Sequence, residues 1–335
     1  MIQIMPKVDQ GDLFVRLFHK AVANQWSSDD VDWEAPLGLE PRQAIALTRV
    51  LTPVYLGEQT AMLGAAVTLP QLAAAGETSA QLYLSTFLLD EARHFEALTQ
   101  LYQRLHHNPV SIREVPEMLR YHHRLRQGDR IDWLWGILIS DLFARQFYYG
   151  FAKVQPAALF GQMSAKILVD ESRHQAFAHT YLKNALPSLP PERRQGLRDM
   201  QSELLKTMEG INRRLHDDTE ALGLDGRAFI GELVAQIEAH SKSIGLFDDD
   251  AGDGDSGSGN HAAWARMIEK KREISLRSGG LIWPRVDAVA KPEEAEEAPR
   301  RRHFYFDFRG LAADCGECFI ALLCRSRAVL AGCTA

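Results

Sequence analysis

Two short segments of this sequence carry residues that could bind metal ions. Residues 90–94 read DEARH and residues 170–174 read DESRH, so each segment places a glutamate three residues before a histidine. Residues three apart project from the same face of a helix. Each Glu-x-x-His pair could therefore hold one ion. Two such helices, joined by one acidic residue from each of two further helices, build a site for two metal ions inside a helical bundle.

Both of the required acidic residues are present. Glu58 precedes Glu91 by thirty-three residues, and Asp141 precedes Glu171 by thirty. The apolar pattern breaks near the midpoint of each interval, at 69–78 and at 154–156. In an antiparallel helix pair, residues equidistant from the turn lie at the same height. The sequence therefore predicts one layer of metal ligands: Glu58, Glu91, His94, Asp141, Glu171 and His174.

Carboxylates and imidazoles together suit iron or manganese, so the predicted cofactor is a pair of Fe ions or a mixed Mn/Fe pair, with O2 as co-substrate. Asp90 and Asp170 are expected to accept the imidazole N–H of the opposite half, and Arg93 and Arg173 to neutralise those aspartates. The alternative is that both motifs form solvated ion pairs at the surface. A dry aromatic pocket should surround an oxidising centre, and the candidates are Phe87, Phe95, Phe147, Tyr148, Phe151 and Phe177. Each of these aromatic residues is more often ordinary core than a substrate contact.

Composition agrees with a large helical protein. The chain has 335 residues, of which 46% are hydrophobic, and the first 245 show no strand-rich pattern, so we expect an all-α fold. A net charge of −6 gives no sign of a nucleic-acid surface. No apolar run approaches the length of a membrane span, and the N-terminus lacks the features of a signal peptide. These features predict a cytoplasmic location.

The chain divides into three parts by composition. Residues 1–247 should form the metal-binding domain, 248–260 an acidic glycine-rich linker, and 261–335 a partly helical, poorly ordered and flexible extension. Within the domain, residues 1–40 are expected to form an irregular arm. Helices are predicted at about 41–68, 78–106, 117–126, 131–153, 157–186, 192–216 and 226–244, and another at 261–277.

All of the cysteines lie in the extension, at Cys315, Cys318, Cys324 and Cys333. Four cysteines in a short segment could bind zinc or an iron–sulfur centre. Their C-x2-C-x5-C-x8-C spacing matches no common pattern, however, so their role stays open.

The metal-binding segments resemble the ferritin-like superfamily over roughly residues 20 to 245. The segments YLSTFLLDEARH at 83–94 and DLFARQFYYGF at 141–151 are similar to the branch that holds ribonucleotide reductase small subunits and the small-subunit-like ligand-binding oxidases. The resemblance implies a four-helix metal-binding core with additional helices and the same six ligands. Asp141 falls on a position that is normally glutamate. Gln59 competes with Glu58 for the first ligand position, and we favour Glu58 because a carboxylate is the better ligand.

Three departures from this family bear on the function that the resemblance implies. Leu98 stands where reductase subunits place a radical tyrosine, four residues after the first histidine. Gly136 stands where the ligand-binding oxidases place a cross-linked tyrosine, five residues before the ligand at 141. Ile167 stands where arylamine N-oxygenases carry an extra histidine. A tyrosyl-radical reductase role and the usual cross-link are therefore not expected.

The resemblance thus implies an O2-activating oxidase or monooxygenase that acts on a small organic molecule in a specialised biosynthetic pathway. Hydroxylation, N-oxygenation, desaturation and oxidative cleavage all stay open. Such an enzyme would need an external electron donor and could form a homodimer. The alternatives are a ferritin-like iron-handling protein and a reductase small-subunit homologue that partners a larger subunit.

Overall fold

The computed structural model describes residues 8–247, and every regular element in that range is helical. This agrees with the all-α, ferritin-like fold expected from the sequence. The linker, the helix predicted at 261–277 and the four cysteines lie outside the described residues. None of the described helices is both long and apolar enough to cross a membrane. The helices are α1 (Leu13–Ala23), α2 (Pro41–Ala75), α3 (Thr78–Leu105), α4 (Pro116–Arg126), α5 (Arg130–Val154), α6 (Leu159–Ala185), α7 (Pro191–Arg214), α8 (His216–Ala221) and α9 (Gly226–Ser243).

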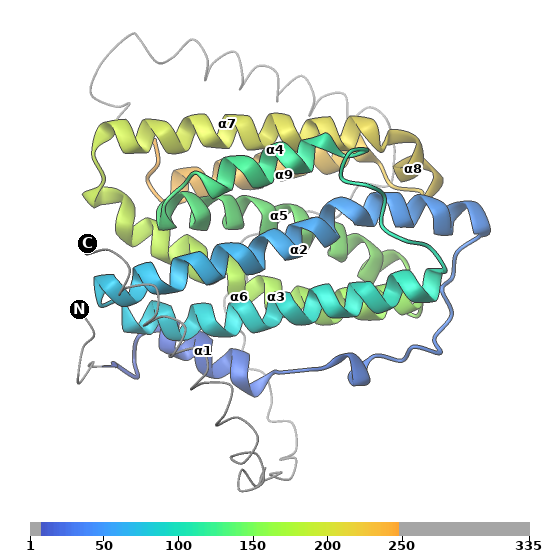
Figure 1. Cartoon of the computed structure of the whole chain (residues 1–335), viewed down its shortest axis with the longest axis horizontal. Helices are drawn as coiled ribbons and strands as arrows, with labels where there is room; N and C mark the ends of the chain where they lie inside the picture. Colours follow the sequence, from blue (N-terminus) through green and yellow to red (C-terminus); the bar gives the residue numbers. More distant parts are fainter. Residues whose placement is uncertain (1–7, 248–335) are drawn as a thin grey trace, which may run out of the picture. The chain divides into compact units, whose positions relative to one another are not determined.

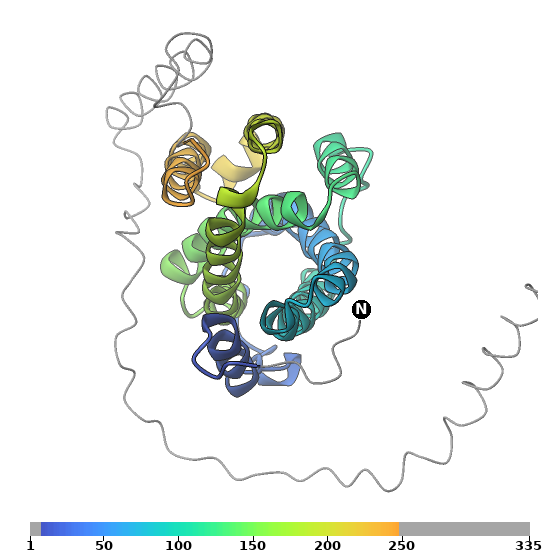
Figure 2. The same ribbon diagram turned by 90° about the vertical axis from the view of Figure 1, so that its left-hand side faces the viewer.

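Two long hairpins form the core of the bundle. Helices α2 and α3 pair as one hairpin and α5 and α6 as the other, and their contacts are the most extensive in the fold (Figure 1). Seen along the bundle, α1 packs against α3 and α6, whereas α4, α7 and α9 lie on the side of α2 and α5 (Figure 2). The interior between the two hairpins is therefore covered from both sides.

The first hairpin turns at a glycine. Gly76 has a left-handed backbone (φ 75°), and the amide of Glu77 bonds back to the carbonyl of Leu72, which ends α2. The sequence predicts an end at residue 68, and this is wrong, since Pro70 lies inside the helix. Pro70 and Ala66 are both exposed, so water can satisfy the Ala66 carbonyl that loses its partner.

Residues 1–40 are also more regular than the sequence suggests. The predicted irregular arm contains α1, whose N-terminus is capped by the Asp12 side chain through the amide of Phe14. The helix buries Val15, Leu17 and Ala21, an apolar stripe at helical spacing that is short enough to be missed. The helix predicted at 192–216 is present as α7, and the sequence does not predict the short helix α8 that follows it.

Close packing of α5 depends on two glycines. A Cβ atom at Gly64 of α2 would overlap the indole of Trp133, and one at Gly136 of α5 would overlap the side chain of Leu125. The missing side chains thus let α2 and α4 approach α5 directly. This contact sets the position of Asp141, one and a half turns after Gly136 on the same helix.

Candidate metal centre

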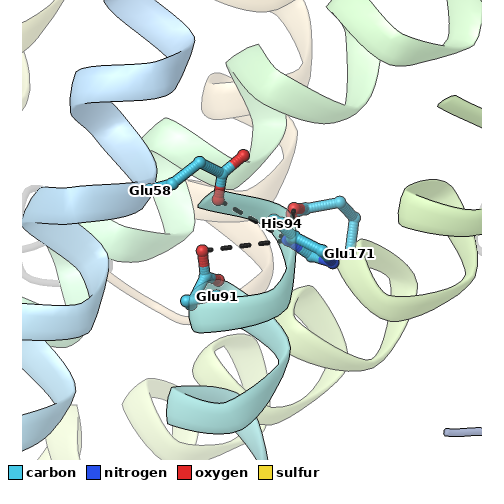
Figure 3. A group of neighbouring side chains, drawn as sticks. All are labelled: Glu58, Glu91, His94 and Glu171. Atoms are coloured by element: carbon cyan, nitrogen blue, oxygen red, sulfur yellow. Dashed lines mark ion pairs between the residues drawn. The ribbon is translucent and has the colours of Figure 1, made fainter. Parts of the chain in front are cut away.

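The six predicted ligands meet in the interior of the four-helix core. Their side chains come from α2, α3, α5 and α6, and none is more than 5% exposed. Two groups of donor atoms are close enough to hold an ion each. One group contains Glu58, Glu91, His94 and Glu171, which point toward one another in Figure 3. The other contains Asp141, Glu171 and His174, so Glu171 belongs to both groups.

Both imidazoles present the same nitrogen to the carboxylates. His94 Nδ1 lies 3.5 Å from Glu58 Oε2, 3.9 Å from Glu91 Oε2 and 3.7 Å from Glu171 Oε1. His174 Nδ1 lies 3.1 Å from Glu91 Oε1 and 3.8 Å from Glu171 Oε2. Glu91 and Glu171 thus lie between the two imidazoles, which is the position that bridging carboxylates require.

The first acidic position belongs to Glu58. Its side chain is buried, whereas the neighbouring Gln59 is exposed on the outer face of α2. Adjacent helical residues differ in direction by about 100°, so only one of the two can face the interior.

The outer nitrogen of each imidazole contacts an aspartate of the other hairpin. His94 Nε2 lies 3.1 Å from Asp170 Oδ2, and His174 Nε2 lies 3.4 Å from Asp90 Oδ2. A carboxylate accepts the Nε2–H proton and so fixes the tautomer in which Nδ1 carries a lone pair. Both lone pairs then face the cluster of glutamates.

Two arginines balance these aspartates. Arg93 contacts Asp90 at 2.5 Å and Asp170 at 2.9 Å, and Arg173 contacts both of the same aspartates. The indole N–H of Trp26 also donates to Asp170, at 2.8 Å, and Arg93 lies over the Trp26 ring. Trp26 lies in the segment predicted to be an irregular arm, and the sequence marks no role for it here. A contact across more than 140 positions leaves no local signal.

Several buried polar atoms of the cluster have no hydrogen-bond partner. They are Nδ1 of both histidines, Glu91 Oε1, Glu171 Oε2 and Asp141 Oδ2. Burial and the nearby Glu58 raise the pKa of Glu91, and burial and Glu171 raise that of Asp141. Burial opposes protonation of His94, but Asp170 and Glu58 outweigh it and raise the His94 pKa. Without cations, the cluster must therefore take up protons to offset its buried charge.

Tyr148 makes a contact with the cluster that sequence reasoning does not predict. Its hydroxyl donates to Glu58 Oε1 at 2.6 Å, and its side chain is fully buried. Helix α5 carries Tyr148 two turns after Asp141, so both residues face the same interior. This bond leaves the other oxygen of Glu58 directed at His94.

A cavity opens beside the cluster between α2 and α5, with α4 and α7 as its outer wall. Glu58, Glu91, Asp141 and Glu171 line one end. Three hydroxyl groups contribute, from Tyr121, Ser140 and Thr207. The remaining wall is mainly apolar and includes Val54, Ala61, Met118, Phe143, Met208 and Ile211.

None of the six aromatic residues expected to form a substrate pocket lines this cavity. Phe87 packs on His174 with ring centroids 4.3 Å apart, and Phe95 stacks on Tyr55 at 4.4 Å. Phe177 packs against α1. Phe147, Tyr148 and Phe151 form a cluster with Phe160. A residue that is close to a metal ligand in sequence can still face another side of the helix. Part of the cavity wall comes from α4 and α7, whose sequences carry no motif.

Comparisons with known proteins identify the fold. No family model matches the chain, and no curated protein matches it. Among solved structures, an R2-like ligand-binding oxidase with an aerobically reconstituted Mn/Fe cofactor superposes with a TM-score of 0.59 at 19% identity, covering 71% of this chain and 95% of that one. A variant with an anaerobically reconstituted Mn/Fe cofactor gives 0.61 at 17% identity, with the same coverage. The chain has the fold of the R2-like ligand-binding oxidases.

Within this fold, neither Gly136 nor Leu98 supplies a phenol. The side chains of Leu125 and Met200 fill the space beside Gly136, so a larger residue there would displace them. Leu98 is fully buried in the core. Tyr148 does place a phenol at the cluster, because its hydroxyl donates to Glu58.

Proposed function

We propose that this protein is an O2-dependent oxidase or monooxygenase that uses a dinuclear Fe or Mn/Fe cofactor and acts on a small organic molecule. The observation that carries the proposal is the buried cluster of four carboxylates and two imidazoles, with unpaired donor atoms facing one space. Four carboxylates match the charge of two divalent cations, which removes the large cost of burying the acids alone. The R2-like oxidases of the same fold bind Mn/Fe.

Each ligand has an expected role. Glu91 and Glu171 would bridge the two ions, His94 and His174 would each bind one ion through Nδ1, and Glu58 and Asp141 would be terminal ligands. Asp141 is shorter than glutamate by one methylene and lines the cavity, so it leaves more space on that side of the cluster.

When bound, the metal pair would supply the reduction of O2 and the resulting oxidising power. The protein's own residues prepare the place for this chemistry. Asp90 and Asp170 hold the imidazoles in one tautomer, Tyr148 orients Glu58, and the covering helices keep bulk water from the ligands. The cavity gives an organic molecule access to the same ligands.

The cavity favours an oxidase over iron storage, because storage needs no apolar chamber beside the ligands. Leu98, at the position of the radical tyrosine of reductase subunits, argues against a radical-generating reductase subunit. In this proposal electrons come from an external donor, and the enzyme works in the cytoplasm, alone or as a homodimer.

An anaerobic reconstitution experiment tests the proposal. Full-length protein loaded with Fe(II) should develop a new visible absorption and consume O2 when air is admitted. Glu91→Ala should abolish both signals, whereas Glu96→Ala, which changes an exposed glutamate of the same helix, should retain them. Equal O2 consumption by wild type and Glu91→Ala, after free iron is removed, would contradict the proposal.

A further inference from the structure

The cavity beside the metal ligands has features that restrict what it can bind. Apart from the four acidic ligands at its inner end, its wall is apolar or carries hydroxyl groups. Within the described part of the chain, no lysine, arginine or histidine lines it. We propose that the substrate is a small, uncharged, ring-sized organic molecule whose one polar group is bound by the hydroxyl of Tyr121. This rests on the proposed function, since it names the substrate class of that site.

Charge is the first argument. Four carboxylates and two divalent ions sum to zero, so a substrate carboxylate or phosphate would add an unbalanced negative charge. No cationic side chain of the wall could offset that charge, so most of the free energy needed to remove an anion from water would not be compensated. A cationic amine would have to compete with the metal ions for the same carboxylates. A neutral molecule avoids both penalties.

Size is the second argument. The space open to the centres of water molecules is about 50 Å3, and a single water needs about 10–15 Å3 on that measure. The cavity thus holds roughly three to five waters, each of which occupies about 30 Å3 in the liquid. This corresponds to a compact molecule the size of one six-membered ring. A long alkyl chain would have to extend beyond this space.

The hydroxyl groups provide the third argument. Ser140 Oγ donates to the Ile137 carbonyl at 2.9 Å, and Thr207 Oγ1 donates to the Glu203 carbonyl at 3.0 Å. The Tyr121 hydroxyl is 3.4 Å from the carbonyl of Gly136, which is near the limit for a hydrogen bond, and it also contacts the Ser140 side chain. Tyr121 is therefore the group with the most to gain from a polar atom of a bound molecule.

Flexible side chains complete the cavity wall. Met118 of α4 and Met208 of α7 lie on the outer side, opposite the acidic end. Methionine adapts its shape and packs well on aromatic rings. A planar ring could thus be held between the two thioethers and the ligand carboxylates, with its polar group toward Tyr121.

Equilibrium binding to the full-length protein tests this proposal with three probes: p-cresol, toluene and octanoate. Titration calorimetry is done on metal-free protein and on protein loaded anaerobically with Mn(II). We expect p-cresol to bind at least ten times more tightly than octanoate in both states. Tyr121→Phe should weaken the binding of p-cresol by about 2- to 10-fold, which corresponds to one hydrogen bond, and should leave the binding of toluene unchanged.

A matched pair of variants locates the site. Ala144→Phe places a ring in the cavity and should abolish binding of both neutral probes, whereas Ala66→Phe, on the exposed face of α2, should not. Circular dichroism checks that each variant is folded. If Ala144→Phe does not fold, Tyr121→Phe provides the test of the site.

Several outcomes would overturn the proposal. These are tighter binding of octanoate than of p-cresol, no binding of either neutral probe, or equal weakening of p-cresol and toluene by Tyr121→Phe. Metal loading is measured separately. If Mn(II) does not bind but the probes do, the proposed function fails while the cavity's preference for neutral rings stands.

Discussion

Replacing Asp170 with asparagine should destabilise the metal-free protein strongly. The side chain is fully buried, and its Oδ2 atom accepts from Trp26 at 2.8 Å, Arg93 at 2.9 Å and His94 at 3.1 Å, while Oδ1 accepts from Arg173. An asparagine side chain has one oxygen and one NH2 group. In the best orientation it keeps the three contacts at Oδ2 and turns NH2 toward the Arg173 guanidinium, which then faces a donor.

The size of the effect follows from these contacts. A hydrogen bond to a charged group contributes about 1.5–3 kcal/mol, and removing one partner of a buried ion pair costs about 3–5 kcal/mol. The two arginine side chains are each 8% exposed, and Asp90 still pairs with both. Both facts favour the lower end of this range of costs. We therefore expect a loss of about 3 kcal/mol, or a fall of about 6–12 °C in Tm for a domain of this size.

Thermal unfolding of EDTA-treated full-length protein, followed by circular dichroism, measures this loss. The matched control is Asp218→Asn, whose carboxylate pairs with the half-exposed Arg49 and should cost no more than about 1 kcal/mol. Asp170→Asn should also weaken Mn(II) binding by about 10- to 100-fold, because a neutral amide oxygen holds the Nε2–H of His94 less strongly than a carboxylate does. If Asp170→Asn and Asp218→Asn gave the same Tm and the same Mn(II) affinity, the reasoning would be refuted.

Three further predictions address other parts of the fold. Gly136→Ala should lower the free energy of unfolding by about 1–3 kcal/mol in urea denaturation, because its Cβ overlaps Leu125, whereas Gly231→Ala, with open space around it in α9, should be neutral or stabilising; equal effects would contradict the packing. Tyr148→Phe removes the donor to Glu58 and should weaken Mn(II) binding by about 2- to 10-fold without loss of fold, and an unchanged affinity would show that this bond does not orient Glu58. Burial and the adjacent His179 lower the pKa of His240 from 6.5 to about 4. The unfolded chain therefore takes up this proton first, and stability is lost as the pH falls from 6.5 toward 4. The Tm of His240→Phe should fall less over that pH interval than the Tm of wild type, and parallel curves of Tm against pH would refute the assignment.

The sequence predicts the ligand layer because its signal is local and repeated. The i, i+3 spacing in 90–94 and 170–174 and the symmetric positions of Glu58 and Asp141 follow from helix geometry alone. The cavity could not be predicted in this way, because Tyr121 and Met208 come from helices with no recognisable motif. They reach the site only through the packing of those helices. Likewise, the bond between Trp26 and Asp170 depends on where α1 and the following segment lie, which no periodicity shows.

Metal stoichiometry tests the central claim most directly, because Glu171 belongs to both ligand groups and Asp141 to one. Anaerobic loading with Mn(II), desalting and elemental analysis should give near two ions per chain for wild type and for the exposed control Glu96→Gln. Asp141→Ala should retain about one ion, and Glu171→Gln should retain almost none. A folded wild-type protein without bound metal, or a Glu171→Gln protein that still holds two ions, would contradict the account.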